Sequence, residues 1–315
     1  MIMPNIPTFS LEELKDGSRQ KELAECVTQI GLFYVSDYGC RDSLHRNVTD
    51  MAIDFFEKSR QEEQAAVSLE QGSNRRGFSG LGTESTASST GVGHYSDYAF
   101  CYSMGTSNNL FPSDEFETVW SGYFDKLYSA SRDIAKSVLI SVEESLNGID
   151  DIDEFLTCEP LLRVRYFPEV PKQRSAENMP SRMAPHYDLS VITLIQQFSC
   201  PNGFVSLQAK IGDKTIALPE KPGTVVILCG AVASLVTRGR IHAPIHHVAA
   251  PPTDRIEGSD RSSAVMFLRP NANFRFSVPD AKKCGLDVSI ESETATFADW
   301  MGGNYVEMLS VEETV

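Results

Sequence analysis

The sequence predicts a mainly β fold with flanking α-helices, organised around a double-stranded β-helix, or jelly roll. Segments rich in β-branched and apolar residues follow one another between residues 161 and 278. Helical periodicity is concentrated before residue 155 and returns in a last piece at residues 296–309. A jelly roll arranges such strands in two sheets and encloses a pocket between them.

A chain of 315 residues is long enough for one large β-core with a helical flank, and a hydrophobic content of 41% supports that core. We find no internal repeat. We therefore expect one domain over residues 1–315, with a helical N-terminal part (1–155), a jelly-roll core (about 156–280) and a C-terminal closing segment (281–315).

The segments before the core carry separate signals. Residues 10–13 have the spacing of a capping box that opens a first helix. Residues 31–35 predict a strand, and residues 41–61 and 112–146 predict helices with apolar faces. The segment 72–94 is rich in Gly, Ser and Thr and predicts a mobile loop, of the kind that often closes over a site.

His186-Tyr-Asp188 and the distant His246 predict a metal site. Residues two apart on a strand point to the same side, so His186 and Asp188 can hold one ion, and the apolar run 191–195 supports a strand. His246 lies in the strand-like stretch 245–248 and must be delivered by the fold. Two imidazoles and one carboxylate on one face of Fe(II) leave positions for a chelating co-substrate and O₂.

A lone His-x-Asp is a weak signal, because a His at a strand end and an Asp in a turn produce it by chance. The chain has only six histidines, which makes the joint pattern stronger. His247 competes with His246, since adjacent strand residues face opposite ways and only one can reach the metal. His242 precedes Ala-Pro and is interpreted as a loop residue.

Arg261 and Ser263 are also two apart, and they lead into the apolar run 264–268. One guanidinium fork and one hydroxyl on the same face suit a carboxylate, which the fork binds in a bidentate manner. The pair therefore predicts a clamp for a small dicarboxylate. Together with the metal motif, it indicates an oxygenase.

Four further arginines allow two interpretations. Arg163 and Arg165 share one side of an apolar strand, where charges are rarely buried unless they are paired. Their partners can be an anionic ligand or nearby acidic residues. Arg75 and Arg76 follow a polar stretch and can equally belong to a solvated loop.

Short motifs from about residue 5 to residue 306 carry a family resemblance. They are Arg75-Arg-Gly-Phe78, Glu84-Ser-Thr86, Tyr95-Ser-Asp-Tyr98, Cys101-Tyr-Ser-Met-Gly105, Asn109-Leu-Phe-Pro112, Leu161-Leu-Arg-Val-Arg-Tyr-Phe-Pro168, Arg182-Met-Ala-Pro-His-Tyr-Asp-Leu-Ser190, Asn202-Gly-Phe-Val-Ser-Leu-Gln208 and Gly302-Gly-Asn-Tyr-Val306. With the metal motif, the chain resembles the 2-oxoglutarate-dependent, non-haem iron oxygenases, and among them the penicillin ring expandases and their hydroxylase relatives.

The resemblance implies roles for the matched positions. Iron would be bound by His186, Asp188 and His246, with His246 chosen over His247 because the family ligand is the first His of the pair. The co-substrate 2-oxoglutarate would be bound by Arg261, Ser263 and Met183. The substrate would be bound by Arg75, Arg76, Arg163, Arg165, Phe267 and Asn304.

The resemblance also implies a reaction: the oxidative ring expansion of a secondary metabolite, from penam to cephem, converting penicillin N to deacetoxycephalosporin C. Two alternatives share the scaffold, namely simple hydroxylation and the fungal, tropolone-forming expansion of a hydroxylated cyclohexadienone. Ile245 departs from the family, which has a basic residue before the second iron-binding His. A zinc hydrolase or sugar-binding jelly roll is less favoured, because no obvious general base lies beside the metal motif.

The composition narrows the partners and the compartment. A net charge of −15 argues against nucleic acid and anionic membranes, and leaves a small molecule as the expected partner. Seven cysteines without a Cys-x-x-Cys pair suggest reduced thiols and a cytoplasmic location. We expect neither a secretory signal, since the start lacks a basic region before an apolar one, nor a membrane-spanning run.

Overall fold

The computed structural model describes residues 6–69, 76–93, 95–142, 146, 149–179 and 181–309, and for residues 304–309 it describes the backbone only. In this part of the chain, no helix combines the length and the apolar character needed to cross a membrane.

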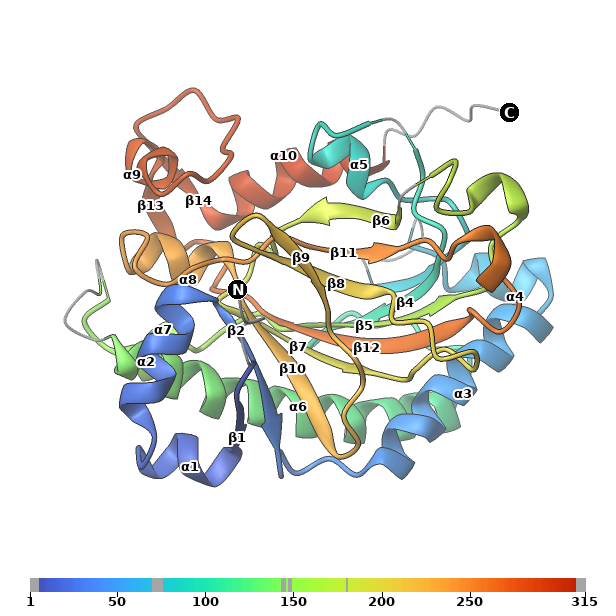
Figure 1. Cartoon of the computed structure of the whole chain (residues 1–315), viewed down its shortest axis with the longest axis horizontal. Coiled ribbons are helices and arrows are strands. Elements are labelled where there is room, and N and C mark those ends of the chain that lie inside the picture. Colours follow the sequence, from blue (N-terminus) through green and yellow to red (C-terminus); the bar gives the residue numbers. More distant parts are fainter. Residues whose placement is uncertain are drawn as a thin grey trace.

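Two β-sheets form the centre of the molecule (Figure 1). The larger sheet has eight described strands, in the spatial order β1 (Thr8–Ser10), β2 (Leu32–Ser36), β10 (Thr224–Cys229), β7 (Ile192–Gln197), β12 (Arg261–Leu268), β5 (Leu161–Phe167), β4 (Phe100–Met104) and β3 (Gly77–Ser79). The smaller sheet has four, in the order β6 (Ser181–His186), β11 (His246–Ala249), β8 (Leu207–Ile211) and β9 (Lys214–Ala217).

The jelly roll is confirmed. Strands β5, β12, β7 and β10 pair antiparallel in the larger sheet, and β6, β11, β8 and β9 pair antiparallel in the smaller one. The chain crosses between the sheets as it passes from β5 to β6 and from β6 to β7. Consecutive motifs of the sequence are thereby placed on opposite walls of one barrel.

The expected boundary at residue 155 does not hold for the larger sheet. Strands β1 to β4 lie before that residue, and β2 and β4 pair directly with the jelly-roll strands β10 and β5. Of these four strands, the sequence predicted β2 alone. Strands β1 and β3 have only three residues each, which is too short for a sequence pattern to show, whereas β4 is as long as β2 and was missed.

Two long helices cover the outer face of the larger sheet. They are α3 (Asp42–Lys58) and α6 (Asp114–Ser141), which lie along that face in Figure 1 and contact β5, β7 and β12. Trp120 and Tyr123 of α6 are fully buried there, as core packing requires. The remaining described helices are α1 (Leu11–Asp16), α2 (Gln20–Gln29), α4 (Gln61–Ala66), α5 (Thr86–Ser89), α7 (Ile152–Phe155), α8 (Ala231–Val236), α9 (Val278–Lys283), α10 (Phe297–Leu309) and the 3₁₀ turns Lys172–Arg174 and Thr253–Arg255.

The capping box at the start of α1 is confirmed, because Ser10 Oγ accepts from the Glu13 amide and the Glu13 carboxylate accepts from the Ser10 amide. The prediction of a mobile loop at 72–94 needs correction. Its described residues, 76–93, contain β3 and α5, and α5 packs against β6 and α10. Buried hydrogen bonds from Thr86 to the Asp97 carboxylate hold this segment to the loop that precedes β4.

Candidate active site

Strand pairing brings the two distant histidines together. The Cα atoms of His186, at the end of β6, and His246, at the start of β11, are direct partners across the antiparallel pair. Their ring centroids are 4.4 Å apart. His247 is paired with Gln208 of β8 and is not part of the cluster of metal-ligating side chains found among the described residues.

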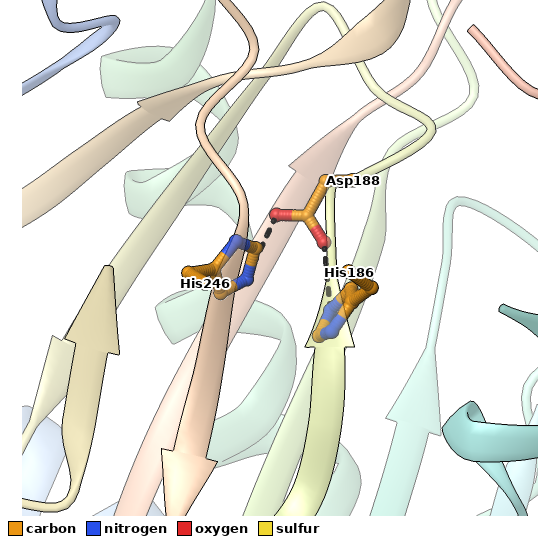
Figure 2. Close-up of side chains that lie close together, drawn as sticks. All are labelled: His186, Asp188 and His246. Carbon is orange, nitrogen blue, oxygen red and sulfur yellow. Dashed lines mark ion pairs between the residues drawn. The ribbon is translucent and has the colours of Figure 1, made fainter. Parts of the chain in front are cut away.

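Asp188 reaches the histidines from a loop. Strand β6 ends at His186, so the prediction that both residues share one strand is wrong, although their closeness is as predicted. The Asp188 carbonyl accepts a hydrogen bond of 2.8 Å from the Ala231 amide at the start of α8, which fixes the loop. The carboxylate then faces both rings, with Oδ1 3.4 Å from His186 Nε2 and Oδ2 3.7 Å from His246 Nε2 (Figure 2).

Backbone carbonyls set the tautomers of both imidazoles. His186 Nδ1 lies 2.8 Å from the Ala184 carbonyl oxygen, and His246 Nδ1 lies 3.4 Å from the Pro244 carbonyl oxygen. Nδ1–H donates in this arrangement, which leaves each Nε2 with a lone pair for a metal. One donor atom from each of the three side chains lies within 4.8 Å of the others.

The electrostatics of this cluster fit a cation. Burial alone would raise the pKa of Asp188, but the two imidazoles outweigh it and lower that pKa to about 2. Burial lowers the pKa of His246 to about 4. At His186, burial is outweighed by the hydrogen bond to Asp188 and by its charge, and the pKa is raised. The cluster therefore holds an ionised carboxylate, the neutral imidazole of His246 and the more basic imidazole of His186. Asp188 Oδ2 is buried and has no hydrogen-bond partner among the described residues, which costs free energy unless an ion binds it. The residues present fit Fe(II).

Arg261 supplies a buried positive charge on the opposite sheet. Its Nη2 donates to Gln197 Oε1 at 2.9 Å and its Nη1 to Ser206 Oγ at 3.3 Å, and the guanidinium lies over the Phe167 ring. No carboxylate of the described residues lies within 4.0 Å of it. Burial lowers its pKa to about 10, so it remains charged at neutral pH. Ser263, two residues on, is also buried.

Of the two apolar residues assigned to the pocket, Phe267 lines a cavity of about 340 Å³ beside His186 and Asp188. Met183 does not line this cavity. It packs instead against Phe167, the ring beneath Arg261, and its Sδ accepts from Arg165 Nη1 at 3.5 Å. Met183 therefore borders the clamp, where the co-substrate was expected.

Arg163 and Arg165 line the cavity and also have acidic partners. Arg163 Nη2 donates to both carboxylate oxygens of Glu84, at 2.7 and 2.8 Å, and Arg165 Nη1 lies 4.0 Å from Asp97 Oδ2. The salt-bridge alternative is therefore realised, on residues that face the cavity. The sequence reasoning missed Glu84 and Asp97. The requirement that buried arginines be paired was the signal that could have prompted a search for them.

The remaining candidates are placed in part. Arg76 is buried with 5% of its surface exposed, which excludes the solvated-loop interpretation for that residue. Arg75 lies outside the described residues, as does the side chain of Asn304, whose backbone belongs to α10. Ile245 lines the cavity and is 41% exposed, so an apolar side chain stands at the mouth.

Known proteins give a consistent picture. Residues 158–270 match the family described as the 2OG-Fe(II) oxygenase superfamily, and residues 6–120 match the N-terminal family of non-haem dioxygenases in morphine synthesis. A deacetoxycephalosporin C synthase of Amycolatopsis lactamdurans is 52% identical over 98% of both chains. A deacetoxycephalosporin C hydroxylase of Streptomyces clavuligerus is 51% identical over 98% of this chain and 97% of its own.

The fold comparison agrees. The structure of a Neurospora crassa protein in complex with alpha-KG and thymine matches with a TM-score of 0.72 over 96% of each chain, at 18% sequence identity. The two relatives that are 52% and 51% identical to this chain are named for cephalosporin chemistry, and they do not favour the tropolone alternative. The cofactor is Fe(II), and the co-substrates are 2-oxoglutarate and O₂. The chain belongs to the 2-oxoglutarate- and Fe(II)-dependent oxygenases.

Proposed function

We propose that this enzyme expands the penam ring of penicillin N to the cephem ring of deacetoxycephalosporin C. The observation that carries the proposal is the 52% identity, over 98% of both chains, to a protein named for that synthesis. A second candidate is hydroxylation of deacetoxycephalosporin C, because the identity to a hydroxylase of that name is 51%. Nucleic acid and membranes have no part in the proposal, and the seven free cysteines favour a cytoplasmic enzyme.

The proposed iron ligands are His186, Asp188 and His246, with Nε2 and carboxylate atoms as donors. When bound, Fe(II) and 2-oxoglutarate supply the oxidising chemistry, with O₂ as the oxidant. The contribution of the chain is to orient these groups and to exclude water. Arg261 and Ser263 would hold the distal carboxylate of 2-oxoglutarate. Met183 would line the co-substrate site beside Phe167.

The cavity next to the cluster is the proposed substrate site. Arg165, whose Nη1 lies 4.0 Å from Asp97 Oδ2, would attract a substrate carboxylate, whereas Arg163 would line the site while paired with Glu84, and Phe267 would contact the ring system. Arg75, Arg76 and Asn304 complete the proposed set. The apolar side chain of Ile245 at the mouth would favour a substrate with an uncharged portion there.

The test is an anaerobic preparation of the enzyme with Fe(II) and 2-oxoglutarate, exposed to O₂ with one of three substrates: penicillin N, deacetoxycephalosporin C or a hydroxylated methyl-cyclohexadienone. Succinate and the mass of the product are measured. Ring expansion removes two hydrogens from penicillin N, whereas hydroxylation adds one oxygen to deacetoxycephalosporin C. We expect coupled succinate with penicillin N. Coupling with the cyclohexadienone alone would overturn the proposal.

A further inference from the structure

Two of the six buried arginines of the described residues, Arg163 and Arg261, have contrasting partners. In β5, Arg163 is matched by the Glu84 carboxylate at 2.7 and 2.8 Å. In β12, the neighbour of β5, Arg261 is matched by the Gln197 amide oxygen at 2.9 Å and by a serine hydroxyl. Both side chains are almost fully buried. Burial therefore does not explain why one has an acid beside it and the other has an amide.

The orientation of the Gln197 amide is fixed from both ends. Its Nε2 donates to the Leu218 carbonyl at 2.8 Å, so Oε1 is the atom that accepts from Arg261. Gln197 itself is 9% exposed and belongs to β7, whose Gln197 position is paired with Ser263 of β12. An amide held in this way fixes the orientation of the Arg261 guanidinium without adding a negative charge beside it.

The strand that carries Gln197 is anchored on its other face as well. Successive strand residues point to opposite sides of a sheet. Gln196, the preceding residue, accepts a hydrogen bond of 2.8 Å from Tyr123 of α6. His45 of α3 in turn lies 2.9 Å from the Tyr123 hydroxyl. This buried chain resists sliding of β7, and so it holds the amide of Gln197 in place.

A carboxylate at position 197 would change the charge and leave the shape almost unaltered. In a buried site, an acid at this distance would pair with Arg261 and cancel much of its attraction for an incoming anion. We infer that Gln197 is a positioning residue that makes the site selective for dicarboxylate co-substrates, because its neutral amide aims Arg261 without neutralising it. The inference rests on the proposed role of Arg261 as the clamp for 2-oxoglutarate.

The experiment measures the affinities of two ligands for the Fe(II)-loaded enzyme without O₂, by calorimetry. They are 2-oxoglutarate and 2-oxopentanoate, which has the same carbon chain but lacks the distal carboxylate. In Gln197→Glu, we expect 2-oxoglutarate to bind at least about tenfold more weakly and 2-oxopentanoate to bind within about threefold of the parent. The preference for the dicarboxylate therefore falls. An unchanged preference would overturn the inference.

A second readout separates positioning from a merely structural role. In Gln197→Glu, the new pairing with Arg261 is offset by the loss of the hydrogen bond that Nε2 donates to the Leu218 carbonyl, so the melting temperature should stay close to that of the parent while co-substrate binding weakens. Gln197→Met removes the acceptor without adding charge. It should lower the preference for 2-oxoglutarate over 2-oxopentanoate severalfold, because the guanidinium of Arg261 is no longer held in its orientation. If Gln197→Glu does not fold, an unchanged preference in Gln197→Met overturns the inference instead.

Two controls identify the source of a failure. Gln208→Glu adds the same charge on β8, where the Gln208 side chain bonds the Val205 carbonyl and not Arg261, and it should leave the preference unchanged. Arg261→Ala tests the clamp itself. If Arg261→Ala leaves 2-oxoglutarate binding intact, the proposed clamp is wrong. If it weakens binding but Gln197→Glu does not, only the inference about Gln197 fails.

Discussion

His186 and His246 are cross-strand partners in the pair β6–β11, and their ring centroids lie 4.4 Å apart. The separation of the two proposed ligands is therefore set by sheet register and not by a flexible loop. A slip of one residue in β11 would turn His246 away from the cluster and present His247 in its place. The adjacent histidines of this strand are consequently distinguishable by mutation.

We expect His246→Ala to lower Fe(II) affinity by more than about 100-fold, which exceeds the usual cost of losing a supporting contact to a metal ligand. His247→Ala should stay within a few-fold of the parent, because the ring of His247 is not in the cluster. The amount of iron that each variant retains after gel filtration under anaerobic conditions compares their Fe(II) affinities. Equal losses in the two variants would contradict the assignment of His246.

Gly230 positions Asp188 indirectly. A Cβ at Gly230 would lie 2.1 Å from the Ser190 carbonyl oxygen, and the next residue, Ala231, donates its amide to the Asp188 carbonyl. Gly230→Ala should therefore destabilise the fold by about 1–3 kcal/mol, as overpacking does, and should also weaken iron binding. Urea unfolding and iron titration check the two effects.

The matched control is Gly122→Ala in α6, where an added Cβ meets no atom of the described structure within 4 Å. This substitution should stabilise the helix by about 0.5–1 kcal/mol and leave iron binding unchanged. A Gly230→Ala variant as stable as the parent would contradict the prediction, because it would show that the backbone at the start of α8 can shift to accommodate the added methyl group.

His45 should make the enzyme less stable in acid. Burial, and to a smaller extent the charge of Arg46, lowers its pKa from 6.5 to about 3, so the folded state holds it neutral. The unfolded chain takes up a proton below pH 6.5, and the folded protein does so only near pH 3. Stability from this residue is thus complete above pH 6.5 and is lost as the pH falls toward 3, by up to about 1.4 kcal/mol per pH unit.

The measurement is the free energy of unfolding in urea at pH 7.5 and pH 5, compared between the parent and His45→Gln. Gln retains a donor for Tyr123 but does not titrate, so its stability should fall less between the two pH values. Identical pH dependence in both proteins would contradict a neutral His45 in the folded state.

Glu84→Gln should destabilise the protein by about 3–5 kcal/mol, because it leaves the buried guanidinium of Arg163 without its compensating charge. The pair Arg60–Glu63 provides the comparison, since both of its side chains are exposed. Glu63→Gln should cost no more than about 1 kcal/mol. Chemical denaturation of the two variants gives the difference, and similar costs would rule out a strong buried pair.

The sequence allowed the jelly roll and the metal cluster to be predicted, because apolar runs, the His-x-Asp motif and a later histidine in a strand-like stretch are all visible in the chain. Runs of β-branched and apolar residues mark the strands, and the motif at residues 186–188 marks two of the ligands. The register that pairs His186 with His246 could not be derived, because it depends on contacts between distant segments. Sequence also suggested one strand for His186 and Asp188, whereas the strand ends at His186.

The partners of the buried charges were the least predictable part. Glu84 lies 79 positions from Arg163 in the chain, and Gln197 lies 64 positions from Arg261. Periodicity indicates that a side chain is buried, but it does not indicate which group lies against it. The contrast between an acid partner and an amide partner emerges only when the sheet brings both arginines into neighbouring strands.

The proposed iron ligands belong to the smaller sheet and its exit loop, whereas Arg261 and Ser263 belong to the larger sheet. A keto acid that chelates the iron at one end and binds Arg261 at the other would link the two sheets, in addition to the hydrogen bonds already present between them, such as that from Arg182 of β6 to the Phe167 carbonyl of β5. Occupancy should then protect the whole jelly roll from thermal opening, by about 2.7 kcal/mol at a hundredfold excess over the dissociation constant. The concentration of 2-oxoglutarate would in this way influence the stability of the enzyme as well as its turnover.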